Sequence, residues 1–398
     1  YVDIGNVDPV RGIVATEQHS FGSSPSRARR IVRHGDVIVS TVRTYLKAIA
    51  RIENPPPNLV VSTGFAVLRP LVGIDSRFIS YALHAPHFLD WVVANSVGVS
   101  YPAINASVLA GFSIIVPPFR EQRAIADFLD RETAKIDALI ERQERLIVKL
   151  EEKRKAMIAQ AVTRGLDPNV PLKESGVEWL GKIPEHWGVS RLTYLFSERD
   201  ERAEPNLPLL NVSISSGVTV REFSDSRIET MAADFNIYKV ARKGDIAFNK
   251  MRMWQGAVGV APVHGLVSPD YTVAHDIGNT VVEYYDALFH IERFFVEVIG
   301  RSHGIVWDRL RLYWDGFKDI RVPVPPRAEQ AAIVANLQAL KSRTDACVSK
   351  IRELVAKLRE RRTALISAAV TGKIDVREHH QLGAYCHEAG LGRSELSV

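Results

Sequence analysis

Two long stretches of this 398-residue chain repeat each other, and the repeat constrains the fold more than any other feature of the sequence. A constant offset of 208 residues takes Pro117 to Pro325 and holds without a gap to Asp167 and Asp375. The matched pairs along it include Glu121/Glu329, Gln122/Gln330, Ile125/Ile333, Leu129/Leu337, Asp137/Asp345, Leu146/Leu354, Leu150/Leu358 and Arg154/Arg362. Self-similarity at so long a period indicates an architecture built from two copies of one unit.

Each copy of the repeat is predicted to form one long helix. Proline precedes each helix, a glutamate suits its positive end, and glycine follows the last periodic residue. Apolar residues recur at three- and four-residue steps: Leu129, Ile136, Leu139, Leu146, Leu150 and Met157 in the first copy, and Leu337, Ile351, Leu354, Leu358 and Leu365 in the second. Each stripe needs an apolar partner, either its own globular neighbour or the other copy. The polarity of the remaining faces, as in "ERQERLIVKLEEKRK", favours the other copy.

The connection between the helices indicates that they run antiparallel. A helix over residues 120–163 would be about 66 Å long. Residues 164–321 leave the end of the first helix and enter the start of the second, so a parallel pair would force this one domain to bridge the whole length. The sequence therefore predicts an antiparallel coiled coil, with the tail from Val376 returning toward the first domain.

The segments ahead of the two helices match more loosely. Residues 32–52 align with residues 241–261, which places Gly35-Asp36 on Gly244-Asp245 and Arg43 on Arg252. Gly-Asp is typical of a turn that leads into a strand, and each domain closes with a helical run. The predicted class is α+β, with two pseudo-repeated domains. The predicted segments are residues 1–116 (first domain), 117–167 (first long helix), 168–322 (linker and second domain), 323–375 (second long helix) and 376–398 (C-terminal tail).

Composition narrows the possible functions. The formal net charge of +5 and a pI near 9.1 favour a polyanionic partner. With no stretch of about 18 apolar residues and no secretory leader, we expect a cytoplasmic location. The two cysteines are too few for a disulfide framework. There is no P-loop, and "ENPPPN" lacks the aromatic residue of an adenine-methyltransferase motif, so we expect no catalytic residues. The cluster His379, His380, Cys386 and His387 could ligate a metal, but it lies in a polar terminal tail, so we expect no metal site.

The repeat "PPFREQRAIADFL…AVTRGLD", the linker "KESGVEWLGKIPEHWGVSRL" at residues 173–192 and the ending "AVTGKIDVRE" resemble the specificity subunit of Type I restriction-modification systems. The resemblance covers residues 1–378. It implies two target-recognition domains that each read half of a split, asymmetric DNA site, joined by an antiparallel coiled coil that acts as a ruler. It also implies three kinds of partner: double-stranded DNA, two methyltransferase subunits and restriction subunits that translocate and cut. S-adenosylmethionine, ATP and Mg are implied for those partner subunits, and no cofactor for this one.

The chain departs from the family pattern at its start. Residues 173–208, which precede the second domain, have no counterpart before Tyr1, so we expect the first domain to be N-terminally incomplete. Two alternatives to DNA recognition therefore stay open. One is a coiled-coil scaffold that binds no DNA, and the other is a truncated, inactive specificity subunit.

The polar residues after each Gly-Asp turn are the candidates for DNA contact. They are Ser40, Thr41, Arg43, Tyr45 and Lys47 in the first domain, and Asn249, Lys250, Arg252, Trp254 and Gln255 in the second. Arginine can bind guanine through two bonds, and asparagine or glutamine can do the same for adenine. Alternatively, both arginines pair with carboxylates and Tyr45 and Trp254 are core aromatics.

The repeated helices supply a second set of candidates, for the coiled coil and for subunit docking. These are Glu121, Gln122, Leu129, Ile136, Leu146, Leu150, Glu329, Gln330, Leu337, Ile351, Leu354 and Leu358.

Overall fold

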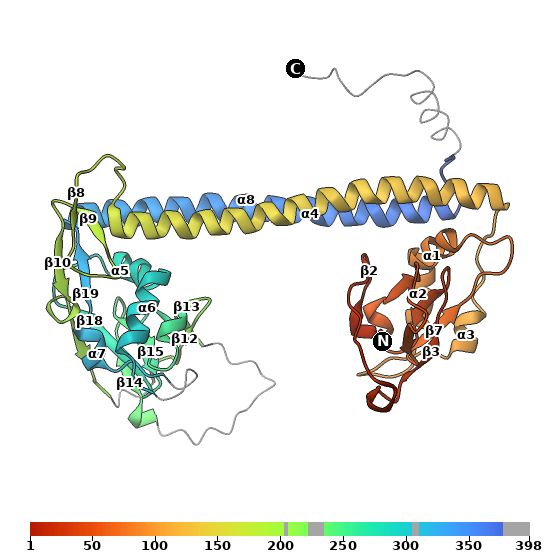
Figure 1. The fold of residues 1–398 in the computed structure, drawn as a ribbon. Coiled ribbons are helices and arrows are strands. Elements are labelled where there is room, and N and C mark those ends of the chain that lie inside the picture. The colour runs from red at the N-terminus through yellow and green to blue at the C-terminus, as the bar shows by residue number, and fades with distance from the viewer. Residues whose placement is uncertain (203–205, 222–234, 305–309, 377–398) are drawn as a thin grey trace, which may run out of the picture. The chain divides into compact units, whose positions relative to one another are not determined.

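The computed structural model describes residues 1–202, 206–221, 235–304 and 310–376. Its internal contacts group the chain into two compact units, Tyr1–Arg145 with Ile351–Val398, and Leu146–Lys350. Each unit holds one globular α+β domain and part of each long helix (Figure 1). The division into five segments, with each helix as a segment of its own, remains a prediction. The cluster His379, His380, Cys386 and His387 lies outside the described residues.

The first unit is built around a small antiparallel sheet with β4 at its centre. All four residues of β4 (Val37–Ser40) are buried, as the apolar run after the Gly-Asp turn predicts. The sheet has the order β5 (Ile49–Arg51), β4, β7 (Phe65–Leu68). The other elements are the hairpin β1 (Val7–Asp8) with β2 (Gly12–Ile13), the pair β3 (Ala28–Ile31) with β6 (Val60–Ser62), and the helices α1 (Ser76–His84), α2 (Pro86–Ala94) and α3 (Ala106–Ala110). Single helical turns lie at Ile4–Asn6, Phe21–Ser23 and Thr44–Leu46.

The second unit repeats this plan around a larger sheet. Its order is β11 (Phe196–Arg199), β18 (Tyr271–Asp276), β15 (Ile246–Asn249), β16 (Val258–Val260). Two-stranded pairs add β8 (Leu172–Glu174) with β9 (Lys182–Pro184), β10 (Gly188–Arg191) with β19 (Arg321–Val324), β12 (Leu210–Ser213) with β13 (Gly217–Val220), and β14 (Lys239–Ala241) with β17 (Gly265–Val267). The helices are α5 (Val282–Phe289), α6 (Glu292–Arg301) and α7 (Trp314–Lys318), with single turns at Leu192–Tyr194, Phe235–Ile237 and Met253–Gln255. Its core is strongly aromatic and includes Trp187, Tyr284, Phe248 and Phe289, all fully buried.

The Gly-Asp turn has the same anchor in both units. Asp36, only 1% exposed, accepts two bonds from the Arg69 guanidinium at 2.8 and 2.7 Å. Burial alone would raise the pKa of Asp36, but the Arg69 bonds hold this pKa below its ordinary value. Asp245 accepts likewise from the Arg199 Nε at 2.7 Å. A buried carboxylate paired in this way fixes the start of the strand that carries the candidate loop.

The two long helices, α4 (Phe119–Arg164) and α8 (Arg327–Val370), run side by side in opposite directions (Figure 1). In the first unit Arg362 pairs with Asp137, and in the second Arg154 pairs with Asp345. Partner numbers fall in one helix as they rise in the other, which confirms the predicted antiparallel coiled coil. Among the described residues, no helix combines the length and apolar character needed to cross a membrane.

The buried line between the helices differs in part from the predicted stripe. Ile136 and Ile351 are buried, and Leu129 lies in the core of the first unit. Leu150, Leu337 and Leu358 are half-buried. Leu139 and Met157 are 46% and 39% exposed, and Leu146 and Leu354 are 42% and 44% exposed, so the assignment of these four residues to the buried seam was wrong. With 3.6 residues per turn the contact line drifts, and the residues after Leu146 and Leu354, Ile147 and Val355, face inward in their place.

The repeated Glu-Gln pair joins each long helix to its own domain. Gln122 accepts from the Asp75 amide at 2.9 Å and donates to the Pro117 carbonyl at 2.8 Å. Gln330 makes the same two bonds, with the Val281 amide and the Pro325 carbonyl, both at 2.9 Å. Both glutamines are almost fully buried, so they are not available for subunit docking, contrary to our prediction.

The two glutamates of this pair differ from each other. Glu329 accepts from His186 Nε2 at 2.8 Å and from the Trp187 indole N–H at 3.0 Å, which ties the linker to the start of α8. Glu329 is therefore an anchor within the chain and not a docking residue. Glu121 remains exposed.

Candidate nucleic-acid interface

The loop that follows β4 carries the first-domain candidates, and the structure divides them into two groups. Ser40 and Thr41 are buried, 3% and 9% exposed, and the Thr41 hydroxyl donates to the Gly64 carbonyl at 2.9 Å. Neither side chain can reach a ligand, because strand pairing turns both into the domain. Their assignment to DNA contact was wrong.

The remaining three first-domain candidates, Arg43, Tyr45 and Lys47, are exposed. Tyr45 is 54% exposed, so it is not a core aromatic. Arg43 and Lys47 bracket the helical turn Thr44–Leu46 with left-handed backbones, φ 54° and 50°. At the matching place in the second unit, the turn Met253–Gln255 ends on Gly256 at φ 92°. The first unit thus places a lysine where the second uses the residue best suited to that conformation.

Neither candidate arginine pairs with a carboxylate in the part of the chain that the structure describes. The Arg43 guanidinium carbon lies 5.0 Å from the centroid of the Tyr101 ring, within cation–π range. Arg252 is exposed on the corresponding loop. Arg69 and Arg199, by contrast, are each hydrogen-bonded to the carboxylate of a buried aspartate. The alternative in which both candidate arginines are structural ion-pair partners is therefore wrong for the described residues.

Three of the second-domain candidates are half-buried and make hydrogen bonds within the domain. Asn249 Oδ1 accepts from the Met251 amide at 2.9 Å, and Lys250 Nζ donates to the Pro269 carbonyl at 3.2 Å. Burial lowers the pKa of Lys250. Trp254 packs against the aromatic core, and its indole N–H donates to the Met251 carbonyl at 3.0 Å. Of this group, Arg252 and Gln255 remain exposed and available to a ligand.

A cluster of basic residues on β3 and its flanks was missed in the sequence. Arg27, Arg29, Arg30 and Arg33 lie within seven residues and all are exposed. Lysines and arginines on a surface strand suit phosphates, which a duplex presents at regular spacing. The run "RARRIVR" is the signal that could have found them.

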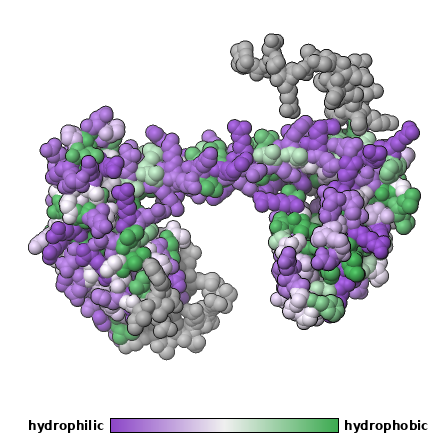
Figure 2. Space-filling view, in the orientation of Figure 1, coloured by the Kyte–Doolittle hydropathy of each residue, from purple (hydrophilic) through white to green (hydrophobic). Residues whose placement is uncertain are grey.

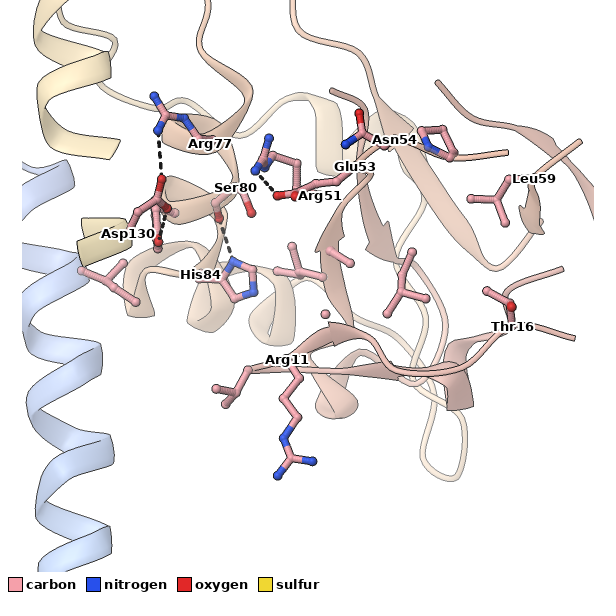
Figure 3. A pocket seen from close by; sticks show the side chains of 18 of the residues that line it. Arg11, Thr16, Arg51, Glu53, Asn54, Leu59, Arg77, Ser80, His84 and Asp130 are labelled. Atoms are coloured by element: carbon pink, nitrogen blue, oxygen red, sulfur yellow. Dashed lines mark hydrogen bonds and ion pairs between the residues drawn. The ribbon is translucent and has the colours of Figure 1, made fainter. Parts of the chain in front are cut away.

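The first unit also contains a pocket of about 530 Å³ next to α1 (Figure 3). Its charged side chains are mostly paired with each other, Arg77 with Asp130 at 2.9 Å and Arg51 with Glu53. His84 donates from its Nδ1 to the Ser80 carbonyl of its own helix at 2.7 Å, and burial lowers the pKa of His84. Arg362, which also lines the pocket, pairs with Asp137, so three of its four arginines are already engaged by carboxylates, and we assign no ligand to it.

Comparison with known proteins agrees with this geometry. Residues 28–149 match the family model described as the Type I restriction modification DNA specificity domain. The chain is 23% identical over 328 residues to the type I restriction enzyme EcoKI specificity subunit of Escherichia coli K12, covering 77% of this chain and 68% of that protein. It is 24% identical over 360 residues to the putative type I restriction enzyme MjaX specificity subunit of Methanocaldococcus jannaschii, covering 86% and 79%.

Two solved structures share the fold. The first, from work on complex assembly and conformational transition of a type I R-M system, has a TM-score of 0.64 at 23% identity and covers 93% of this chain and 90% of its own. The second, the HsdS subunit from Thermoanaerobacter tengcongensis, has a TM-score of 0.53 at 22% identity, with coverage of 94% and 90%. At these identities the likeness establishes the fold.

Proposed function

We propose, from the premise that this chain belongs to the family of type I restriction-modification specificity subunits, that it recognises a split, asymmetric DNA site in the cytoplasm and directs modification and restriction subunits to it. In this proposal the chain is a recognition subunit and not a catalyst. S-adenosylmethionine, ATP and Mg are cofactors of the partner subunits. The target is double-stranded DNA, and each of the two domains reads one half.

One observation carries the proposal. The same loop, placed after the same anchored Gly-Asp turn, presents an exposed arginine in both domains, Arg43 and Arg252, and neither has a carboxylate partner among the described residues. The neighbours of the two arginines differ: Lys47 is exposed in the first loop, and Gly256 takes its place in the second. One scaffold with two different contact surfaces is what two different half-sites require.

The chemistry of the exposed residues suits a duplex. Arginine can donate two bonds to the O6 and N7 atoms of guanine, and Gln255 could bind adenine in the same manner. The arginines of residues 27–33 and Lys47 would supply phosphate contacts, which give affinity without sequence preference. Arg43, Arg252 and Gln255 are therefore the proposed base-reading residues.

The helix pair supplies a surface for the methyltransferase subunits. Figure 2 shows hydrophilic side chains over most of the two helices, interrupted by apolar patches. The large apolar side chains exposed on α4 and α8 in the described residues are Phe119, Leu139, Leu146, Val148, Met157 and Leu354. Large apolar side chains left exposed on a helix favour a protein partner. Leu146 and Leu354, which proved not to face the seam, are thus the proposed docking residues.

Binding measured at two salt concentrations tests the proposal. The subunit, assembled with its methyltransferase partner, is titrated with random-sequence duplex and with duplex carrying the motif found modified in cells. We expect salt-dependent affinity for both and tighter binding to the motif. A coiled-coil scaffold without DNA-binding function would show neither, and a truncated, inactive subunit would leave genomic DNA without a modified bipartite motif.

A further inference from the structure

The loop at residues 96–104 is fastened to the candidate loop at residues 41–47. The Arg43 amide donates to the Pro102 carbonyl at 2.8 Å, and the Ile104 amide donates to the Thr41 carbonyl at 2.9 Å. The hydroxyls of Thr44 and Ser96 lie 2.8 Å apart in a third bond. Bonds at both ends of the loop therefore fix the backbone beside Tyr101 relative to that of Arg43.

The loop at residues 96–104 is also closed on itself. Val97 and Ala103 exchange two backbone bonds, both 2.9 Å long, around Gly98 at φ 117°. Ile104 anchors the end of the loop in the core, but three large side chains before it point outward: Val97 is 81% exposed, Val99 fully exposed and Tyr101 62% exposed. The exposed Tyr101 ring is therefore not part of the core. The Tyr101 ring faces the Arg43 guanidinium, whose carbon lies 5.0 Å from the ring centroid.

We propose that Tyr101 is a positioning residue for base reading, which holds the Arg43 guanidinium at one face so that its in-plane N–H groups are directed at the edge of a guanine. This inference rests on the proposed function. When a guanidinium stacks on an aromatic ring, rotation of the arginine side chain is restricted, but the N–H groups stay available as donors. In the described part of the chain no acceptor binds those N–H groups, so the ligand supplies the acceptors.

The second unit builds the neighbouring loop in the same way. The Leu312 amide donates to the Lys250 carbonyl at 2.9 Å, matching the bond between Ile104 and Thr41. His303 and Arg311 exchange two backbone bonds that close this loop. Both units therefore hold a second loop against the loop that carries the candidate arginine. In the first unit this second loop places the Tyr101 ring against Arg43.

Four variants of the specificity subunit, each assembled with the methyltransferase subunits, test the inference: Tyr101→Ala, Tyr101→Phe, Arg43→Ala and the double variant Tyr101→Ala/Arg43→Ala. Binding is measured against the modified motif and against duplexes with each base pair of the motif replaced in turn. We expect Tyr101→Ala to lose about two- to fivefold of the discrimination at the position that Arg43→Ala relaxes, because an exposed cation–π contact has this strength. Tyr101→Phe keeps the ring and should bind as the wild type does.

The double variant separates positioning from a general loss of structure. If Tyr101 acts through Arg43, removing both side chains should cost no more discrimination than Arg43→Ala alone. Equal loss in Tyr101→Phe and Tyr101→Ala, additive losses in the double variant, or unchanged discrimination in Tyr101→Ala would each overturn the inference. Arg252→Ala is the matched control and should relax a position in the other half-site. Absence of discrimination in the wild-type complex would instead refute the proposed function.

Discussion

Arg362 donates from its Nε to both carboxylate oxygens of Asp137, at 2.9 and 3.2 Å, across the helix pair in the first unit. The repeat offset of 208 residues takes Asp137 to Asp345 and Arg154 to Arg362, and in the second unit Arg154 pairs with Asp345 at 3.0 Å. Each long helix thus contributes the acid to one pair and the base to the other. This is the pairing that two copies of one helix make when they pack antiparallel.

The Arg362–Asp137 pair should contribute measurably to stability, because the Arg362 side chain is only 15% exposed. We expect Arg362→Ala to lower the free energy of unfolding by about 1 kcal/mol. Denaturant titration measures the change. Arg359→Ala is the control, since Arg359 is 61% exposed and pairs with Glu144, and it should cost less. The double variant Asp137→Arg/Arg362→Asp exchanges the two charges. If it were no more stable than either single variant, the ion pair would not be the source of the stability.

The repeat made much of this fold predictable. Helix ends depend on local signals, proline before and glycine after, and Gly165 and Gly372 indeed take left-handed backbones at φ 78° and 70°. The direction of packing follows from chain connectivity. The inward face was harder to predict, because Leu146 and Ile147 are equally apolar and only the drift of the contact line decides between them.

The candidate site could be predicted in part. The position of the loop follows from the alignment of Arg43 with Arg252, but burial does not: Ser40 and Thr41 look as available as Lys47 in the sequence. Tyr101 was missed because 58 residues separate it from Arg43, and only long-range backbone bonds bring the two together.

Lys47 provides a test in which stability and binding change in opposite directions. Its left-handed backbone costs about 1–2 kcal/mol that glycine would not incur, so Lys47→Gly should stabilise the fold. If the side chain neutralises a phosphate, the same variant should bind duplex more weakly, with the slope of log affinity against log salt reduced by about 0.9. Thermal unfolding and salt titration measure the two effects. Unchanged binding would show that Lys47 does not contact DNA.

Gln330 should be essential to the joint between α8 and its domain. Replacing it with alanine leaves the Val281 amide and the Pro325 carbonyl without their partner, at a cost of about 1–3 kcal/mol. Denaturant titration of Gln330→Ala measures the loss, and Gln338→Ala, at an exposed position of the same helix, is the control. Equal stability of the two variants would mean that the joint is held by other contacts.

Acid should destabilise the first domain through Asp36. The Arg69 bonds lower the pKa of Asp36 below 3.8 in the folded state, so the stabilisation is complete above that pH and is lost as the pH falls through the folded pKa. Asp36→Asn should therefore reduce the free energy of unfolding at pH 7, with a difference from the wild type that shrinks below pH 4. Unfolding measured across this range checks the sign. A difference that stays constant down to pH 2 would show that the charge of Asp36 is not the cause.

Lengthening the helix pair tests the ruler that the family resemblance implies. Inserting seven residues after Leu146 in α4 and seven after Arg352 in α8 adds two turns, about 10.5 Å, to both helices while each apolar stripe keeps its phase. Because Asp137 and Arg362 lie on one side of the insertions and Arg154 and Asp345 on the other, both ion pairs can still form. We expect methylation mapped in cells to show the same bases in each half-site with an unread spacer about three base pairs longer, at 3.4 Å per pair. An insertion in α4 alone should abolish activity, because it shifts one ion pair out of register. An unchanged spacer with altered bases would contradict the ruler and leave the helices as docking surfaces.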